Sequence, residues 1–247
     1  MTHDLIPGFI TVRTSSSRLP QKCLLPFGNC NVITHVIRRA KYYNIDPILC
    51  TSIDSSDDIL IDIAIKEGIK YFRGSLNNKL KRWYDCSNEY NLSFFHTIDA
   101  DDPFFDGDQM HRSINLLKKE KFDIVCPTDF SSSGGASVGY SLSSEVVREA
   151  VINLEDNTDT EMIWNYLKNI QNVKSTVLEE LTLNPPKMRL TLDYNEDYWL
   201  LNIIQRLVGT YGSREEINLI FERNPDLSSI NWFLNKEWKD AQIKKSK

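Results

Sequence analysis

Short apolar runs alternate with amphipathic stretches along the first half of the chain. Several runs have the length and the β-branched or aromatic content of buried strands, and they cover residues 9–12, 47–50, 70–72, 92–98 and 123–127. Between these runs, apolar residues recur at the spacing of a helix. The predicted helices begin after Asn31, which is a candidate N-cap, and lie over 57–67, through Trp83 and Tyr84, and over 110–119. Repeated strand–helix units with short connections predict a mostly parallel sheet with helices on both faces. The expected fold class is therefore α/β, a three-layer α/β/α sandwich with a Rossmann-like sheet.

The pattern is less regular beyond residue 128. A loop rich in Ser and Gly is expected to lead into a short strand over 138–140. Further helices are predicted over 144–153, 160–169 and 196–223, and further strands over 174–178 and 188–192. The charged tail, residues 236–247, reads as a solvated end of the chain.

Composition and charge narrow the classes of function. The 247 residues include 29 Lys and Arg against 34 Asp and Glu, a net charge of −5, which argues against a surface that binds nucleic acid. The five cysteines show no C-x-x-C spacing, which is typical of reduced thiols and argues against structural zinc. Neither a signal peptide nor an apolar run of membrane-spanning length is evident. We expect a soluble cytoplasmic protein with no nucleic-acid or membrane partner.

Residues 8–28 contain the strongest candidate for chemistry. A buried strand is followed directly by a polar loop, residues 13–22, in which Arg13, Arg18 and Lys22 alternate with hydroxyl side chains, and then by a helix. α/β proteins commonly hold phosphate on such a unit, because backbone N–H groups and cationic side chains converge in the loop. The alternative is a surface loop that is merely basic. Three cations so close to a buried strand favour phosphate.

Two groups of carboxylates follow later strands. Asp99, Asp101 and Asp102 come at the end of the strand over 92–98, and Asp193 follows the strand over 188–192. The carboxyl edge of a parallel sheet is where α/β folds bind ligands, and hard oxygen ligands beside a phosphate suit Mg²⁺. The alternatives are an acidic turn before Pro103 and, for Asp193, a helix N-cap.

The loop of residues 13–22 also carries a family signature. It resembles the pattern R-x-[GA]-S-x-R-L-P-x-K of the acylneuraminate cytidylyltransferase family, which includes the CMP-Kdo synthetases. The matching residues are Arg13, Ser16, Arg18, Leu19, Pro20 and Lys22, while Ser15 stands where the family has Gly or Ala. The segment TIDADDPFFD resembles the family's R-[IV]-T-[AG]-D-[CN]-P-L-[IV]-D. This aligns Asp101 with the family's metal-binding Asp, while Thr97 and Asp99 replace its Arg and Thr.

Weaker similarities extend over most of the chain. LTLDYNED resembles a late D-x-x-x-D segment, whose first Asp, matched by Asp193, completes the family's metal site. GSLNNKLKR resembles G-S-x-x-D-V-L-x-R, a segment of the spore-coat-polysaccharide branch, with Ser75 matching and Asn78 replacing the Asp. Of that branch's R-E-H-V-T motif only Glu161 has a match, so we expect a diverged acceptor pocket.

The resemblance implies a CTP-dependent nucleotidyltransferase with the fold of nucleotide-diphospho-sugar transferases. Such an enzyme would transfer CMP from CTP to an acidic sugar of the sialic, legionaminic or Kdo type, release pyrophosphate, and serve surface polysaccharide biosynthesis. The resemblance implies nucleotide binding by Val12, Arg13, Ser15, Ser16, Arg18, Lys22 and Ser75, catalysis by Arg13 and Lys22, and Mg²⁺ binding by Asp101 and Asp193.

We interpret residues 1–247 as a single domain in a homodimer, with a nucleotide-binding half over 1–128 and an acceptor and dimerisation half over 129–247. Two alternatives stay open. In the first, the enzyme accepts a sugar phosphate or polyol phosphate, or it uses a nucleotide other than CTP. In the second, the chain binds nucleotide without turnover.

Overall fold

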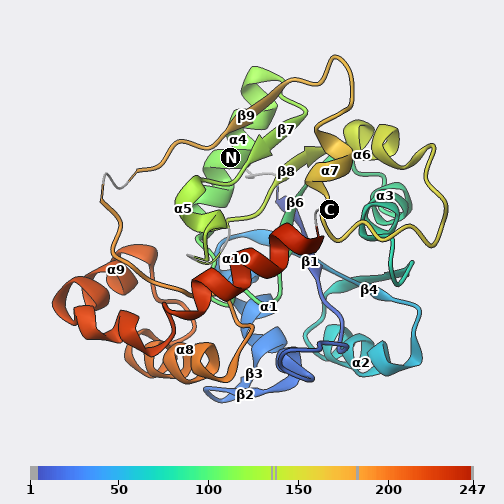
Figure 1. Cartoon of the computed structure of the whole chain (residues 1–247). Helices are drawn as coiled ribbons and strands as arrows, with labels where there is room; N and C mark the ends of the chain where they lie inside the picture. Colours follow the sequence, from blue (N-terminus) through green and yellow to red (C-terminus); the bar gives the residue numbers. More distant parts are fainter. Residues whose placement is uncertain (1–4, 135, 137, 182–183, 246–247) are drawn as a thin grey trace.

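The computed structural model describes residues 5–134, 136, 138–181 and 184–245 of the chain. Its centre is a seven-stranded sheet with the order β5-β4-β1-β6-β8-β7-β9 (Figure 1). The strands are β1 (Ile6–Thr11), β4 (Ile45–Ser52), β5 (Lys70–Gly74), β6 (Phe94–Asp99), β7 (Ile124–Cys126), β8 (Ser141–Ser143) and β9 (Ser175–Val177). Strand β8 is antiparallel to β6 and β7, and the other pairs are parallel. The mostly parallel sheet predicted from the sequence is confirmed.

Helices cover both faces of this sheet. One face packs against α1 (Val32–Tyr42), α2 (Asp58–Lys66) and α4 (Gly107–Glu120), and the other against α3 (Lys79–Glu89), α6 (Ser144–Val151) and α7 (Trp164–Leu167). Successive side chains of a strand point to opposite faces. Accordingly, Ile10 of β1 packs in the core beneath α1, whereas Phe9 stacks on Phe95 in the core beneath α3. The predicted three-layer sandwich is therefore confirmed.

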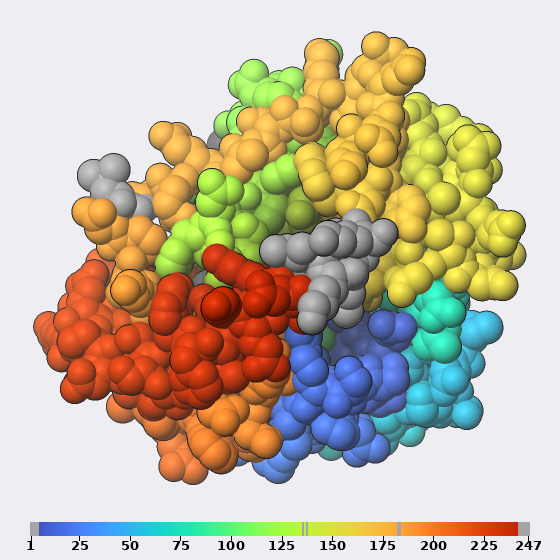
Figure 2. Space-filling view, in the orientation of Figure 1, coloured from blue at the N-terminus to red at the C-terminus, as the bar shows by residue number. Residues whose placement is uncertain are grey.

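The C-terminal part of the chain forms a third apolar cluster beside the sheet. Helices α8 (Asn195–Val208) and α9 (Arg214–Arg223) pack there against the hairpin of β2 (Pro26–Phe27) and β3 (Cys30–Asn31). The short helices η1 (Lys22–Leu24), η2 (Ser55–Asp57), α5 (Asp129–Ser132) and η3 (Pro225–Ile230) complete the elements, with α10 (Leu234–Lys245) at the end. Helix α10 crosses the front of the molecule, where its red surface lies near the centre of the face (Figures 1 and 2).

Several expectations for the second half of the chain are wrong. Residues 188–192 form no strand, because Leu190 N–H donates to Gly134 O and Leu192 N–H donates to Asp101 O, on two different segments. The strand expected over 138–140 begins only at Ser141, after Gly139 with φ +80°; residue 137, just before it, lies outside the described residues. The helix expected over 160–169 is limited to α7, and the one over 196–223 is interrupted at Gly209, where φ is +69°. The tail forms a helix, and its charged residues Lys236, Glu237, Lys239 and Asp240 are exposed, as expected of a solvated end.

Among the described residues, no helix is long and apolar enough to cross a lipid bilayer.

Candidate active site

The loop after β1 is fixed at its start by a buried carboxylate. Asp57 accepts hydrogen bonds from the backbone N–H and the hydroxyl of Thr14, each at 2.8 Å, and from the hydroxyls of Thr51 at 3.0 Å and Ser52 at 2.6 Å. Burial alone would raise the pKa of Asp57, but these donors outweigh it and hold the pKa below its ordinary value. Asp57 therefore stays ionised and ties the loop to the end of the neighbouring strand β4.

Lys22 and two carboxylates from distant parts of the chain meet at the carboxyl edge of the sheet. Lys22 Nζ lies 2.8 Å from Asp101 Oδ2 and 3.0 Å from Asp193 Oδ1, and it also donates to Leu192 O at 2.8 Å. Arg18 Nη2 donates to the same Asp193 Oδ1 at 2.7 Å. Burial would lower the pKa of Lys22, but the two carboxylates outweigh it and raise the pKa above its ordinary value. The ammonium group is therefore charged.

A buried arginine holds Asp193 from the other side. Arg189 is 0% exposed, and its guanidinium donates to both carboxylate oxygens of Asp197, at 2.9 and 3.1 Å, and to Asp193 Oδ2 at 3.4 Å. Its Nη1 also donates to Asn235 Oδ1 in α10 at 3.0 Å. Asp197 in turn accepts from the backbone N–H of Asp193 at 2.9 Å. Arg189 thus fixes the second carboxylate and connects it to the C-terminal helix.

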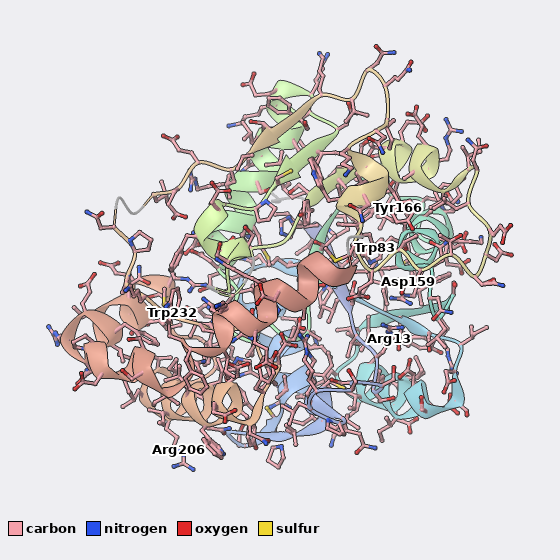
Figure 3. The ribbon with its side chains drawn as sticks, in the orientation of Figure 1. Arg13, Trp83, Asp159, Tyr166, Arg206 and Trp232 are labelled. Carbon is pink, nitrogen blue, oxygen red and sulfur yellow. The ribbon has the colours of Figure 1, made fainter. Side chains whose placement is uncertain are left out.

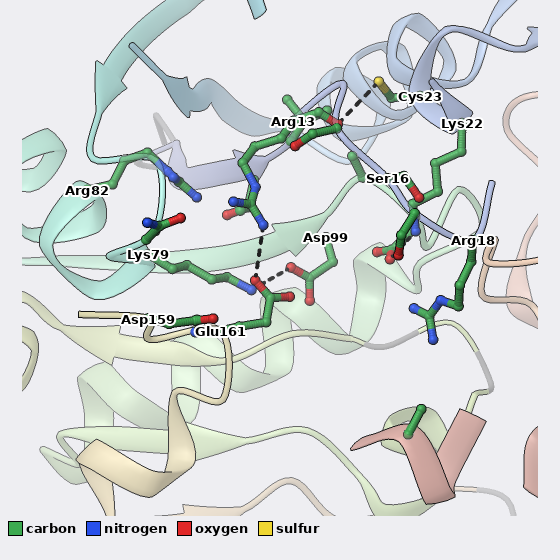
Figure 4. A pocket seen from close by; sticks show the side chains of 18 residues that line it. Arg13, Ser16, Arg18, Lys22, Cys23, Lys79, Arg82, Asp99, Asp159 and Glu161 are labelled. Carbon is green, nitrogen blue, oxygen red and sulfur yellow. Dashed lines mark hydrogen bonds and ion pairs between the residues drawn. The ribbon is translucent and has the colours of Figure 1, made fainter. Parts of the chain in front are cut away.

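A cavity of about 490 Å³ opens above the loop, and we call it the first cavity. Its wall includes all the predicted nucleotide-binding residues except Ser75, and it also includes Asp101. Arg13 donates to Leu76 O at 2.8 Å and lies 3.6 Å from Glu161 across the cavity (Figure 4). Ser75 is outside this wall; its hydroxyl donates to Asp156 O and accepts from Asn78 N–H, so it stabilises the turn before α3.

A second cavity, of about 390 Å³, adjoins the first and is called the second cavity here. The two share the side chains of Arg18, Lys79, Asp99, Asp101 and Glu161. Lys79 Nζ is 3.3 Å from Asp99 Oδ1. Figure 4 shows that Lys79, Asp99, Glu161 and Arg13 point toward one another. Asp193 belongs to the wall of the second cavity. The metal-binding candidates therefore stand on the boundary between two spaces, each large enough for a small molecule.

Comparison with known proteins identifies the family of the chain. A family model described as Cytidylyltransferase matches residues 8–228. The chain belongs to the cytidylyltransferase family. It is accordingly a CTP-dependent nucleotidyltransferase.

Relatives agree with this assignment. The chain is 27% identical over 237 residues to the spore coat polysaccharide biosynthesis protein SpsF of Bacillus subtilis, covering 89% of this chain and 95% of that protein. It is 25% identical over 131 residues to a 3-deoxy-manno-octulosonate cytidylyltransferase of Rickettsia canadensis, covering 51% of this chain and 53% of that protein. A solved cytidylyltransferase from Leptospira borgpetersenii, 21% identical, shares the fold with a TM-score of 0.78 over 91% of this chain and 97% of that one.

The carboxylates of this cytidylyltransferase fit a magnesium ion. In the structure the ammonium of Lys22 occupies the point on which Asp101 and Asp193 converge, so this point already accommodates a positive charge at contact distance from both. Among the described residues, no group of three or more His, Cys, Asp or Glu side chains is placed to hold a metal. Two carboxylates, with the remaining positions left to water and phosphate, are the ligand set that Mg²⁺ ordinarily takes.

Several residues of the cytidylyltransferase site were missed from the sequence. Asp57 read as part of a helix's first turn, and Arg189 as part of an apolar strand. The nearby partners, Ser52 and Thr51 for Asp57 and Asp193 and Asp197 for Arg189, were the available signal, while Thr14 and Asn235 are distant in the sequence. Lys79 stands where the quoted family segment has Val, and this replacement was the available signal for a new cation. Trp238 of α10 lines the second cavity, although the tail was expected to be solvated.

Proposed function

We propose that this cytidylyltransferase transfers CMP from CTP to a hydroxyl group of an acidic sugar, with Mg²⁺, and releases pyrophosphate. The observation that carries the proposal is the meeting of Lys22, Asp101 and Asp193 on the boundary between the two cavities. CTP would occupy the first cavity, where the cations of the loop are. The acceptor would occupy the second, so that its hydroxyl faces the α-phosphate across this boundary.

Attack on the α-phosphate needs positioning and neutralisation of charge more than covalent help from the protein. Arg18 and Lys22 supply that charge, and in the structure both are held by carboxylates, with Asp193 Oδ1 shared between them. A triphosphate offers the same two cations stronger anionic partners, which frees the carboxylates for a metal ion. Mg²⁺ bound there supplies positive charge at the reacting phosphate. Arg13, on the wall of the first cavity, adds a further contact to the triphosphate.

The acceptor class rests on the relatives and on two side chains. One relative is named for spore coat polysaccharide biosynthesis and another for 3-deoxy-manno-octulosonate, an acidic sugar, which supports a role in surface polysaccharide biosynthesis. Arg18 and Lys79 are the cations on the wall of the second cavity, and they are the groups available to an acceptor carboxylate. The alternative acceptor is a sugar phosphate or polyol phosphate.

The proposal includes a cytoplasmic homodimer. The cysteines of the described chain are free thiols, which is consistent with a reducing compartment. Trp199, Ile203 and Leu207 recur at every fourth position of α8 and are 59%, 37% and 61% exposed, so they line one apolar face of that helix. Such a face supports contact with a second subunit.

The test is product formation across two panels. The protein is incubated with Mg²⁺, each of the four ribonucleoside triphosphates, and a set of sialic, legionaminic and Kdo-type acids, sugar phosphates and polyol phosphates. Pyrophosphate is measured, and the product is identified by mass spectrometry. We expect a CMP-sugar from CTP and one acidic sugar. Pyrophosphate release only with a phosphorylated acceptor or with another nucleotide would replace the proposal by that alternative, and CTP binding without product would leave a binding protein.

The same assay tests the loop. Arg13→Ala and Lys22→Ala should each lose several kcal/mol of transition-state stabilisation, about 10²- to 10³-fold in turnover, because each removes a preorganised contact to the triphosphate. Arg148→Ala removes a surface cation that pairs with Glu145 away from both cavities and serves as the control. Turnover like that of the wild type in either loop variant would remove the loop from the mechanism.

A further inference from the structure

The second cavity has a charged inner boundary and an aromatic outer part. The charged side chains that it shares with the first cavity include Lys79, Asp101 and Glu161, and in the proposed reaction this boundary is where the α-phosphate would lie. The wall that belongs to the second cavity alone includes Trp164 and Trp238. A molecule that presents a hydroxyl at the boundary and fills the second cavity would therefore contact a wall that includes these two tryptophans.

The two tryptophans come from elements far apart in the chain. Trp164 opens the short helix α7 and Trp238 lies in α10, and the two helices approach the front of the molecule from different sides (Figure 1). Trp164 is 39% exposed, so a large apolar ring system faces open space in the cavity. Trp83 (labelled in Figure 3) also lines this cavity, but it is 1% exposed and its Nε1–H donates to the Thr11 hydroxyl at 2.9 Å. Indole rings bury much apolar area with little loss of conformational freedom, and the CH face of a sugar ring is a suitable partner for them.

Helix α10 is anchored so that Trp238 is held at this wall. Asn235 accepts a hydrogen bond from Arg189 Nη1 at 3.0 Å, and its amide donates to Ser133 O at 3.4 Å. The guanidinium of Arg189 lies 5.5 Å from the centre of the Trp238 ring, which places a buried, charged group against the indole. The match to the family ends at residue 228, before α10 begins. The helix therefore adds a wall to the second cavity from outside the part of the chain that matches the family.

We propose that the second cavity is the acceptor site, and that Trp164 and Trp238 form an aromatic clamp for the ring of a pyranose sugar. The inference rests on the proposed transfer reaction and specifies its acceptor site. The sugar ring would pack against both indoles, using the face of Trp238 that Arg189 leaves open, with its reacting hydroxyl at the boundary beside Asp101. Helix α10 thereby selects acceptors by the shape of the ring, while the loop of residues 13–22 holds the nucleotide.

The test compares Trp164→Ala and Trp238→Ala with the wild type on the sugar acid that gives the highest turnover. Loss of one stacking partner should raise the KM for the sugar about tenfold, while the KM for CTP changes less than about twofold. Trp164→Phe and Trp238→Phe keep an aromatic face and should restore most of the affinity. Phe233→Ala is the matched control, because Phe233 is 63% exposed and lies one residue before α10, outside the cavity wall. Thermal unfolding confirms that each variant is folded.

A second measurement separates the clamp from the reaction. Binding of N-acetylneuraminate, N,N′-diacetyllegionaminate and 3-deoxy-manno-octulosonate is followed by saturation-transfer NMR, with Mg²⁺ and α,β-methylene-CTP present. Binding that is lost in both alanine variants supports the clamp even if no product forms, in which case the proposed function alone fails. Product formation with an unchanged sugar KM in both variants overturns the clamp and leaves the proposed function standing. A wild-type protein that binds none of the three sugars also overturns the clamp.

Discussion

Replacement of Arg189 by Met should destabilise the protein strongly. Arg189 and Asp197 are both 0% exposed, and removal of the guanidinium leaves the Asp197 carboxylate buried without a counter-charge. Breaking a buried ion pair from one side costs about 3–5 kcal/mol. Asp197 keeps three neutral donors, the backbone N–H groups of Asp193 and Tyr194 and the amide of Asn231, so we expect the lower end, about 3 kcal/mol. For a chain of this size that corresponds to a fall in Tm of about 6–12 °C.

The assay is urea and thermal unfolding of Arg189→Met beside two comparison variants. Arg148→Met breaks an exposed pair on α6 and should change the free energy of unfolding by less than about 0.5 kcal/mol. The double variant Arg189→Met/Asp197→Leu removes both buried charges, so most of the loss should be recovered, apart from about 1 kcal/mol for the helix cap that Asp197 provides. If Arg189→Met loses no more stability than Arg148→Met, or if the double variant is less stable than the single one, the reasoning about the buried pair is refuted.

Three further predictions follow from other parts of the structure. Asp57→Asn should lower the free energy of unfolding by about 1–3 kcal/mol and weaken CTP binding, which calorimetry measures, because an amide nitrogen cannot accept the hydrogen bonds that a carboxylate oxygen of Asp57 accepts. The exposed Asp58→Asn should change neither quantity. Burial lowers the pKa of His96 from 6.5 to about 4, so the unfolded chain takes up the proton first and the free energy of unfolding falls as the pH drops below 6.5. Between pH 7.5 and pH 5.5 the wild type should lose about 1.4 kcal/mol more of this free energy than His96→Gln. Equal losses in the two proteins would contradict the prediction. Leu207→Glu should convert a dimer into a monomer in sedimentation velocity, and a monomeric wild type would remove the dimer from the account.

The strand–helix rhythm of the first half was predictable because both faces of the sheet are covered by amphipathic helices, which leave a regular pattern. The error at residues 188–192 has a different cause. An apolar run shows that a segment is buried, and not whether its N–H groups pair with one strand or, as Leu190 and Leu192 do, with two separate segments. Nor does an apolar sequence guarantee burial, because Ile59 and Ile65 of the largely apolar helix α2 are 45% and 61% exposed.

The site, too, was predictable from the sequence only in part. Arg13, Lys22, Asp101 and Asp193 were chosen from local patterns, and the structure brings Lys22, Asp101 and Asp193 into contact. What the patterns could not show is that the cations of the loop are paired with the carboxylates. That pairing depends on Leu192 N–H meeting Asp101 O, a contact between residues far apart in the chain. Their roles in binding nucleotide and metal stay predictions.

The most direct test of the central claim is a titration with Mg²⁺ of CTP-dependent pyrophosphate release by the wild type, Asp101→Asn and Asp102→Asn. Asp101 contacts Lys22 on the boundary between the cavities, whereas Asp102 is 4% exposed and accepts a hydrogen bond from the Thr191 hydroxyl. Both variants keep the size of the side chain, and thermal unfolding serves as the control for folding.

We predict that wild-type release rises with Mg²⁺ and stops when the ion is chelated, and that Asp101→Asn loses about 10²-fold or more at every concentration, while Asp102→Asn stays within about tenfold. Equal activity of the two variants, or release that is unaffected by chelation, would contradict the account.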